Sequence, residues 1–321
     1  MRDLVSVIIP VYNSAAFLQK SLENLLQQTY PNLEIIVVDD ESTDNSYAIA
    51  KQFEPKGLQV LQQKNAGAAV ARNTGLSAST GNYIQFLDAD DYLSPDKIEK
   101  QVAALDGRYD KVALCNYISF VSDDELDKEI KLEDQSLFIY SSDHPAEFLI
   151  NLLGSKGESN FIQTNCWLVP RAILNKSGRW RNYRCPDDDG EFFSRVLLAS
   201  EGIVYVPGVM NYYRRADTEH KLSANSNKKY LQNTLLTIDL KYRYLKEKTN
   251  DKKIQKAFAR QYFEFAVYNY YNHRILSKIA LKRYGQMNET VKPPLLGGKM
   301  VEIVKKIFGW KTALLIKSAF N

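Results

Sequence analysis

Residues 83–91 read Tyr83-Ile84-Gln85-Phe86-Leu87-Asp88-Ala89-Asp90-Asp91, an apolar run that ends in a cluster of carboxylates. The run is short and nearly continuous in apolar residues, which is typical of a parallel strand covered on both faces. Asp88 and Asp90 follow its carboxyl end, two residues apart on a turn. Carboxylate oxygens are the hard ligands that Mg²⁺ and Mn²⁺ prefer, although an acidic turn can also serve only to solvate a loop or to cap a helix.

The chain before this run alternates strands and helices. The expected strands are Val5–Pro10, Glu34–Val38, Gln59–Leu61 and Tyr83–Leu87, and helices are expected after Asn13, after Asp44 and over Gly67–Ser79. This βαβαβαβ order predicts an α/β fold with a doubly wound, mostly parallel, Rossmann-like sheet and right-handed crossovers. Ligands of such sheets bind at the carboxyl ends of the strands. Asn13, Asp39–Asp40 and Asp88–Asp91 are all expected there.

The later sequence is less regular and ends in a helical region. We expect strands at Phe161–Pro170 and Ile203–Arg214, a helix at Glu191–Ala199, a solvated loop at Asp123–Asp134, helices from Lys228 onward and one long aromatic helix at Ile254–Tyr284. Residues 223–321 carry 20 Lys/Arg against 6 Asp/Glu, a net charge of +14, whereas residues 1–222 carry 22 against 32, a net charge of −10. This asymmetry predicts a boundary near residue 223, with an acidic part that suits a metal site and a basic part that suits an anionic surface.

The composition disfavours several classes of protein. Cys115, Cys166 and Cys185 have neither metal-ligand spacing nor the number of a disulfide framework, so we expect the reducing cytoplasm. We expect no signal peptide, and no run of about 18 apolar residues exists that would span a membrane. No Gly-x-Gly-x-x-Gly follows the first strand, and Pro10 stands where that turn would begin. A nicotinamide-dependent oxidoreductase is therefore disfavoured.

Two further segments in the first half offer ligand contacts. Residues 37–44 read Val-Val-Asp-Asp-Glu-Ser-Thr-Asp, and an Asp at a strand end can accept a hydrogen bond from the imide N–H of a pyrimidine base. The alternative is that Asp39 or Asp40 only caps the next helix. In residues 65–75, small side chains let the backbone approach a ligand, and Arg72 is a natural phosphate partner. The same small residues also suit close packing of a helix on a sheet.

A last acidic cluster consists of Asp187, Asp188 and Asp189, directly before an amphipathic helix. Adjacent carboxylates repel one another, which raises the pKa of at least one of them and suits a general base. The alternative is a helix start rich in negative charge, which the helix dipole favours in any case.

Taken together and in this order, these segments resemble the bacterial-type family 2 glycosyltransferases, inverting enzymes with the GT-A fold. The matching text is Ser6–Asn13, residues 37–44, residues 65–75 and Phe86–Asp91, and Asp189 with Phe192 and Arg195 resembles the family's catalytic-base motif. The resemblance extends over about Leu4–Ser223. It implies a GT-A catalytic domain at residues 1–222, with a donor half at about 1–105 and an acceptor half at about 106–222, followed by a basic helical region at 223–321.

The resemblance implies how the nucleotide sugar would bind. Pro10 and Tyr12 would line the pocket for base and ribose, with Asp40 reading the base and Asp39 close beside it. Asp88 and Asp90 would carry Mn²⁺ or Mg²⁺, with Asp90 as the direct ligand. Further donor contacts are expected from Asn13, Asn65, Gly67, Arg72, Ala89 and Arg214.

The resemblance also implies the reaction. Asp189, with Asp188 as the other candidate, would deprotonate an acceptor hydroxyl, and a single displacement would invert the anomeric centre. The expected donor is a nucleotide-diphosphate sugar, first of all a UDP-sugar, and the expected acceptor is a glycan or a lipid-linked glycan in polysaccharide or glycoconjugate synthesis. No nucleic-acid partner is expected. A second hypothesis is a nucleotide- or glycan-binding relative that has lost its activity.

The chain departs from the family pattern at three places. Glu41 stands where Gly is usual, which should perturb the turn but not the chemistry, and Asp188 stands where Glu often precedes the base. The Gln-x-x-Arg-Trp signature of processive synthases is missing, which favours a single transfer.

His220 lies where relatives close a loop over the diphosphate. It is either a further metal ligand or an ordinary surface histidine, and Arg214 or Lys221 could pair with phosphate there.

The tail, residues 297–321, carries five lysines and a single acidic residue, Glu302. On a helix, Val301, Val304, Ile307 and Phe308 share one face, bordered by Lys299, Lys306 and Lys317. This pattern suits peripheral contact with the anionic inner face of a membrane. The alternatives are packing on the preceding long helix or a homodimer formed through residues 223–321.

Overall fold

The computed structural model describes residues 2–126, 132–215 and 227–320. It divides into two compact units. Unit 1 consists of Met1–Leu149 and Phe161–Asn225, and unit 2 consists of Ile150–Asn160 and Ser226–Asn321. Nothing in the charge pattern marks residues 150–160, which join the C-terminal unit although they lie in the middle of the chain.

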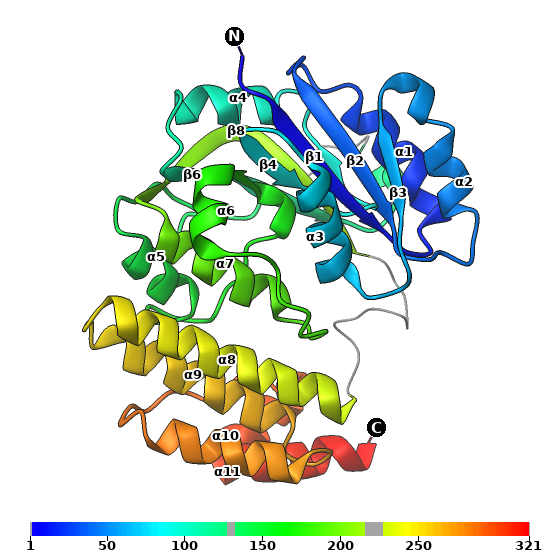
Figure 1. The fold of residues 1–321 in the computed structure, drawn as a ribbon. Coiled ribbons are helices and arrows are strands. Elements are labelled where there is room, and N and C mark those ends of the chain that lie inside the picture. Colours follow the sequence, from blue (N-terminus) through cyan, green and yellow to red (C-terminus); the bar gives the residue numbers. More distant parts are fainter. Residues whose placement is uncertain (1, 127–131, 216–226, 321) are drawn as a thin grey trace. The chain divides into compact units, whose positions relative to one another are not determined.

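Unit 1 is built on one eight-stranded sheet in the order β3-β2-β1-β4-β7-β6-β8-β5 (Figure 1). The strands are β1 Val5–Val11, β2 Leu33–Asp39, β3 Gln59–Gln62, β4 Tyr83–Phe86, β5 Tyr92–Leu93, β6 Lys111–Phe120, β7 Trp167–Pro170 and β8 Gly202–Arg214. β1 to β4 pair in parallel, as the sequence predicts. β7 is antiparallel to both β4 and β6, β5 is antiparallel to β8, and β6 and β8 are parallel. The second half of the sheet is therefore mixed.

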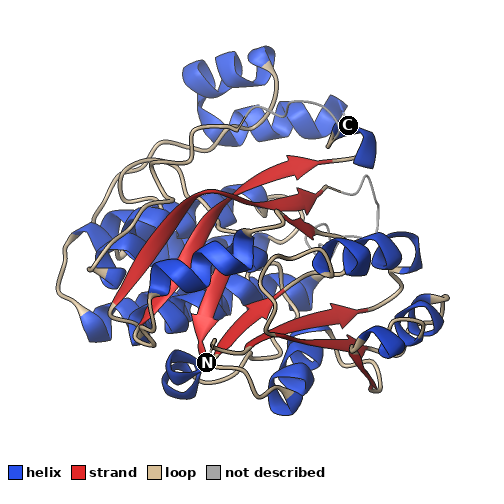
Figure 2. Ribbon diagram, turned by 90° about the horizontal axis from the view of Figure 1, so that it is seen from above, coloured by secondary structure: helices blue, strands red, loops and turns tan. Residues whose placement is uncertain are grey.

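Helices cover both sides of the sheet, as the view from above shows (Figure 2). They are α1 Ala15–Leu25, α2 Ser46–Lys51, α3 Ala68–Ala78, α4 Lys97–Leu105, α5 Pro145–Leu152, α6 Arg171–Ser177 and α7 Asp188–Ala199. α3 packs directly on β1 and β2. A Cβ added to Gly75 of α3 would lie 2.4 Å from Ile8 Cγ2, so at this position the small residue serves close helix–sheet packing.

Unit 2 is helical beyond residue 227, as the sequence predicts. Its helices are α8 Lys228–Lys248, α9 Lys253–Tyr268, α10 Arg274–Gly285 and α11 Lys299–Phe320. The prediction of one continuous helix at Ile254–Tyr284 is wrong. The chain turns after α9, where the Asn269 side chain donates to the Phe265 carbonyl at 2.8 Å, and Ser277 Oγ of α10 donates back to the Ala266 carbonyl at 2.8 Å. Both helices thereby bury apolar faces that one straight helix could not bring together.

The strand expected at Phe161–Pro170 is shorter, because Thr164–Cys166 form a turn of 3₁₀ helix before β7. Among the described residues, no helix combines the length and apolar character that crossing a membrane requires.

Candidate active site

The carboxyl ends of β1 and β2 lie side by side, because Val11 pairs with Asp39. The loops that follow are joined by Asn13, whose Oδ1 accepts hydrogen bonds from the Thr43 N–H at 2.8 Å and from Thr43 Oγ1 at 3.2 Å. Asn13 adopts φ 49°, a left-handed conformation that Asn tolerates better than most residues. Tyr12, directly before it, is half exposed and available for contact.

The Asp40 carboxylate organises the loop before α3. Its Oδ1 accepts from Gln63 Nε2 at 2.7 Å and from the Ala66 N–H at 2.9 Å, and its Oδ2 accepts from the Gly67 N–H at 2.8 Å. Asn65 Nδ2 donates to the Asp40 carbonyl at 3.1 Å. Three predicted site residues, Asp40, Asn65 and Gly67, are thus brought together. Since both carboxylate oxygens of Asp40 are used, its visible role is to hold the loop.

The neighbouring carboxylate, Asp39, is fully buried and differs in one respect. Its Oδ2 accepts from the Ser42 N–H at 3.2 Å and from Gln62 Nε2 at 3.1 Å. Its Oδ1 is buried and has no hydrogen-bond partner among the described residues. A buried carboxylate oxygen without a donor is unfavourable, so this atom is suited to accept a hydrogen bond from a ligand.

Glu41 explains one departure from the family pattern. It adopts φ 62°, the left-handed region in which Gly is favoured. Its carboxylate accepts a hydrogen bond from the Asn65 N–H at 3.1 Å, which partly offsets the backbone strain. The turn is therefore kept, and the loop that Asp40 organises gains one more contact.

The carboxylates of the turn after β4 differ in burial and in their contacts. Asp91 is fully buried, and it accepts from the Arg214 N–H at 2.8 Å and from Asn165 Nδ2 at 2.5 Å. Burial, and then the charges of Asp90 and Asp88, raise its pKa well above the usual value. Asp88 and Asp90 are only half-buried, and Ala89 between them is buried. Asp91 therefore holds the turn, and Asp88 and Asp90 are the two carboxylates of the turn that stay partly exposed.

Arg72 of α3 is the buried cation of this site. Its Nη2 lies 2.7 Å from Asp88 Oδ1, and its guanidinium lies 4.5 Å from the centre of the Trp180 ring. Its positive charge also acts on Asp188 and Asp189, since it lowers the pKa of both. Arg72 thus links the turn after β4 to the start of α7.

Asp188 and Asp189 lie in the first turn of α7 and are half-buried. Asp188 accepts from the Asp189 N–H at 2.9 Å, and Asp189 accepts from the Gly190 N–H at 2.7 Å. Burial, followed by the charges of Asp188 and Asp187, raises the pKa of Asp189 to about 7. Burial also raises the pKa of Asp188, against the effect of Arg72. With a pKa near 7, Asp189 can be ionised at neutral pH and still bind a proton readily, as a general base requires.

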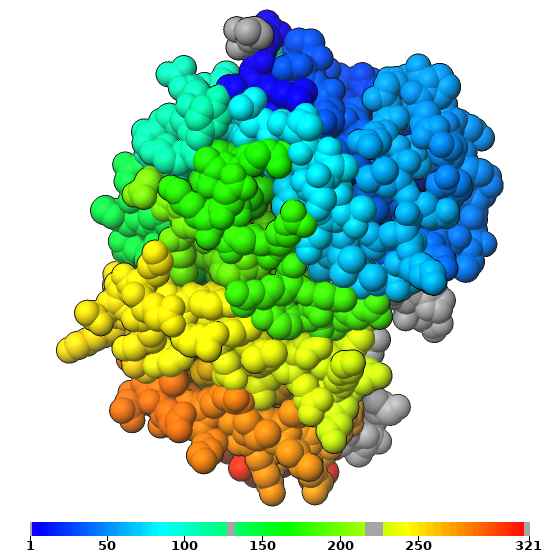
Figure 3. Space-filling model, viewed as in Figure 1, coloured from blue at the N-terminus to red at the C-terminus, as the bar shows by residue number. Residues whose placement is uncertain are grey.

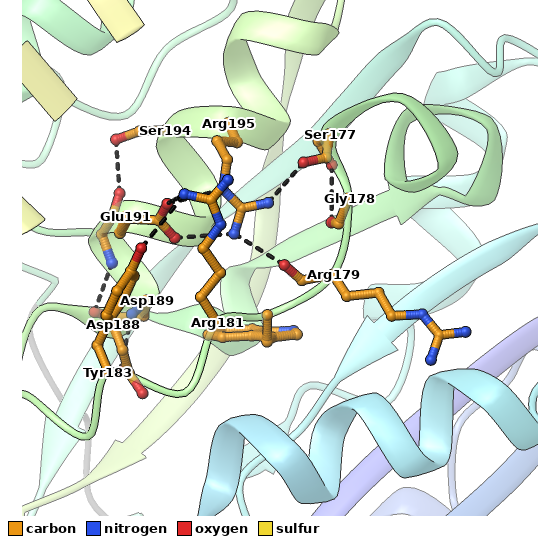
Figure 4. Close-up of polar contacts among 12 residues, drawn as sticks. Ser177, Gly178, Arg179, Arg181, Tyr183, Asp188, Asp189, Glu191, Ser194 and Arg195 are labelled. Carbon is orange, nitrogen blue, oxygen red and sulfur yellow. Dashed lines mark hydrogen bonds and ion pairs between the residues drawn. The ribbon is translucent and has the colours of Figure 1, made fainter. Parts of the chain in front are cut away.

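Figure 4 shows the support beneath these two residues. Glu191 is fully buried, and its carboxylate forms a two-pronged pair with Arg195, Nε to Oε1 and Nη2 to Oε2, both at 2.9 Å. Arg195 also donates to the Ser177 carbonyl at 2.6 Å and to the Arg179 carbonyl at 3.0 Å. The start of α7 is thereby tied to the loop that follows α6.

That loop reaches the donor side of the site through Trp180. Its ring stacks on Phe192 with centroids 3.9 Å apart, and Asn73 of α3 bonds the Trp180 backbone in both directions, at 2.8 and 3.1 Å. Further along, Asn182 Nδ2 donates to the Ala66 carbonyl at 3.1 Å. In the space-filling view, the green segment around residues 175–190 lies against the cyan segment around residues 65–80 (Figure 3). No pattern in the sequence singled out Trp180 or Glu191.

Arg214, which the sequence placed near phosphate, is 5% exposed in the structure. Its Nε donates to the Asp90 carbonyl at 3.0 Å, and its guanidinium pairs with Asp123 and lies 4.4 Å from the centre of the Phe120 ring. Against the effect of burial, hydrogen bonds from Lys20, Arg214 and Tyr92 lower the pKa of Asp123 to about 2. Arg214 therefore fixes the turn after β4 from behind, and Asp123 is its counter-ion.

His220 lies outside the described residues. Within residues 2–126, 132–215 and 227–320, no three His, Cys, Asp or Glu side chains form a group that could hold a metal by themselves. Asp88 and Asp90 offer two carboxylates. Mg²⁺ is commonly held by one or two carboxylates together with substrate phosphates, so the chemistry of this pair fits such an ion.

Comparison with known proteins agrees with this architecture. The family model "Glycosyl transferase family 2" matches residues 6–178. Glycosyltransferase GlyG of Streptococcus pneumoniae is 32% identical over 227 residues, which are 67% of this chain and 72% of GlyG. Glycosyltransferase GlyA of the same organism is 34% identical over 215 residues, which are 66% of this chain but only 30% of GlyA. The chain thus corresponds to less than a third of the length of GlyA.

Two solved structures share the fold. TarS 1–349 of S. aureus, in complex with UDP-GlcNAc, has a TM-score of 0.67 and 20% identity, covering 89% of this chain and 82% of that chain. The mannosyltransferase PcManGT of Pyrobaculum calidifontis, in complex with GDP-Man and Mn²⁺, has a TM-score of 0.55 and 19% identity, covering 91% and 77%.

The support beneath α7 yields a first prediction. Arg195→Lys keeps the charge but removes the fork that bonds Glu191 and the two carbonyls. A buried carboxylate without its full set of donors is strongly destabilising, so we expect the free energy of unfolding to fall by about 2–4 kcal/mol. Chemical denaturation measures it. The matched control is Arg181→Lys. The Arg181 side chain is 46% exposed, and its Nη1 lies 3.3 Å from Glu191 Oε1, which is longer than the two bonds from Arg195. Equal losses in both variants would contradict the assignment.

Proposed function

We propose the following function from the premise that the chain belongs to glycosyl transferase family 2. The protein transfers a sugar from a nucleotide-diphosphate sugar to an acceptor hydroxyl, in one displacement that inverts the anomeric carbon. The observation that carries the proposal is the link through Arg72. It joins a pair of carboxylates suited to a metal–diphosphate complex to a carboxyl group whose pKa is about 7. A relative that only binds a nucleotide or a glycan would use one end of this arrangement, whereas sugar transfer uses both.

We assign recognition of the base to Asp39, although the family resemblance pointed to Asp40. The Asp40 oxygens are occupied by the 63–67 loop, whereas Asp39 Oδ1 is buried without a partner. Uracil presents an imide N–H that such an oxygen can accept. In this proposal Tyr12, which is half exposed directly after β1, covers the base, and Pro10 contributes beside it. A UDP-sugar is thus the donor that we propose, and UDP-GlcNAc is the ligand in the TarS complex.

The Asp39→Asn substitution tests this assignment. If the remaining amide oxygen keeps the donors of Ser42 and Gln62, the new NH₂ group takes the place of Oδ1 and opposes the imide N–H. We expect the dissociation constant for UDP to rise at least about tenfold, as for a lost hydrogen bond to a charged group. The dissociation constant for CDP should rise less, because N3 of cytosine is an acceptor. Calorimetry with both nucleotides measures the change, and an equal loss for UDP and CDP would refute base reading by Asp39.

We propose that Asp88 and Asp90 hold Mg²⁺ or Mn²⁺ together with the diphosphate of the donor. Such an ion stabilises the negative charge that develops on the leaving diphosphate. The chain's own contribution is to fix the turn: Asp91 and Arg214 hold it from the buried side, and Arg72 orients the Asp88 carboxylate. PcManGT, which shares the fold, binds Mn²⁺ in its complex.

For the metal, we expect Asp90→Asn to lower the transfer rate by at least about two orders of magnitude, because one metal ion can supply several kcal/mol. EDTA should abolish transfer, and Mn²⁺ or Mg²⁺ should restore it. The measurement is release of UDP under saturating donor. Glu41→Gln removes another carboxylate at the same edge of the sheet and is the control, and its activity should stay within about threefold of the unaltered chain. Full activity in EDTA would contradict metal dependence.

We propose that Asp189 is the general base. In its ionised form it takes the proton from the acceptor hydroxyl while the oxygen attacks the anomeric carbon in line with the departing diphosphate. The pKa of about 7 makes the group a stronger base than an ordinary aspartate. Asp188 stays beside it as a negative charge that helps to raise that pKa. The acceptor that we propose is a glycan or lipid-linked glycan in polysaccharide or glycoconjugate synthesis.

The pH profile tests the base. Because only the ionised carboxylate accepts the proton, kcat/KM should rise about tenfold per pH unit below pH 7 and level off above it. Asp189→Asn should abolish transfer while the dissociation constant of the donor changes little, since only the transition state needs the base. Asp187→Asn is the matched control and should retain activity, with the rising limb displaced to lower pH. If Asp188→Asn is inactive and Asp189→Asn is active, the roles of these two residues are exchanged.

A further inference from the structure

α11 is divided into two parts by Gly309, which has φ 82° and ψ 165° in the middle of the helix. The part after the break packs into unit 2. Trp310 meets Phe263 and Tyr270 edge-on, with ring centroids 5.7 and 5.0 Å apart, and Ala313 is fully buried. Packing on the preceding helices, one of the alternatives considered from the sequence, therefore accounts for this part of the tail.

The part before the break is different. Met300, Ile303 and Ile307 are 76%, 53% and 65% exposed. At 100° per residue they lie within about 60° of one another around the helix, so they form one continuous apolar stripe. The sequence predicted a face through Val301, Val304, Ile307 and Phe308. Ile307 and Phe308 are exposed, at 65% and 66%, whereas Val301 and Val304 are half-buried.

Lysines border this stripe on one side. Lys299 and Lys306 are exposed and lie seven residues apart, within about 60° of Ile303 around the helix. The other predicted border lysine, Lys317, donates to the Leu296 carbonyl at 2.6 Å, and Lys305 donates to the Pro294 carbonyl at 2.8 Å. Those two stabilise the fold of the tail, so the outward charge comes from Lys299 and Lys306. We call Lys299, Met300, Ile303, Lys306 and Ile307 the α11 face.

We propose that the α11 face binds the surface of a membrane that contains anionic lipids, with the helix in the plane of the headgroups. The apolar stripe enters the boundary of the acyl chains, and the two lysines contact lipid phosphates. Residues 226–321 carry 20 Lys/Arg against 6 Asp/Glu. A second copy of the chain would bring an equally positive surface against this one, whereas an anionic bilayer is complementary to it. The charge therefore favours a membrane over a homodimer as the partner of the stripe.

Co-sedimentation of the full chain with vesicles tests the proposal. The probes are vesicles of phosphatidylcholine alone and of phosphatidylcholine with 30% phosphatidylserine, at about 0.1 M salt, where exposed charges are only partly screened. We expect the unaltered chain to bind the anionic vesicles and to lose most of that binding in 0.5 M salt. The triple variant Met300→Gln, Ile303→Gln, Ile307→Gln keeps the net charge and should bind at least about tenfold more weakly.

Ile275→Gln is the matched control. Ile275 is 69% exposed on α10 and lies outside the α11 face, so this variant should bind as the unaltered chain does. The proposal is overturned if the unaltered chain stays in the supernatant with anionic vesicles, or if the triple variant binds equally well. It is also overturned if sedimentation velocity shows a dimer that the triple variant abolishes. UDP release with a soluble acceptor should be unchanged in the triple variant, so failure of this proposal and failure of the proposed function are distinguishable.

Discussion

The site depends on the pairing of Arg72 with the carboxylates around it. Without a cation between them, the partly desolvated carboxylate of Asp88 and those of Asp188 and Asp189 would repel one another. The guanidinium of Arg72 bonds Asp88 directly and lowers the pKa of the other two. The relation is reciprocal, because a buried arginine such as Arg72 is itself unfavourable without negative partners. The carboxylates of the donor side, Asp88 and Asp90, and those of the base side, Asp188 and Asp189, are therefore held in one electrostatic unit, although the two groups lie about a hundred positions apart in the sequence.

Aromatic rings give both buried arginines their orientation. Arg72 lies over Trp180, and Arg214 lies over Phe120, with guanidinium-to-centroid distances of 4.5 and 4.4 Å. Trp180 is in turn fixed by stacking on Phe192 and by the side chain of Asn73. Since Phe192 belongs to α7 and Asn73 belongs to α3, Trp180 connects the helix that begins with Asp188 and Asp189 to the helix that carries Arg72, through its ring and its backbone. A planar guanidinium that stacks and bonds at once is a role that lysine could not fill.

Much of this architecture could be predicted from local sequence, and the remainder could not for a physical reason. Apolar runs that end in polar residues located β1 to β4 and the clusters at their ends, because burial on both faces leaves a local signature. The counter-ions Asp123 and Glu191 and the ring of Trp180 left no such signature, since their roles arise from contacts across the fold. The aromatic run from Ile254 to Tyr284 kept a helical period through the turn at Asn269. Only the return of α10 onto α9, through Ser277, requires the break.

The carboxylates within one acidic cluster have different roles, and residue type alone does not reveal which residue has which role. In the pair at the end of β2, Asp40 uses both carboxylate oxygens on the 63–67 loop, while Asp39 has one oxygen without a donor among the described residues. In the turn after β4, Asp91 is buried against Arg214 and Asn165, while Asp88 and Asp90 remain half-buried. In both clusters one carboxylate is committed to the loop and thereby fixes the position of its neighbours. Adjacent aspartates are chemically identical in a sequence. The backbone N–H groups that the fold directs at each carboxylate decide whether it has a structural role or can bind a ligand.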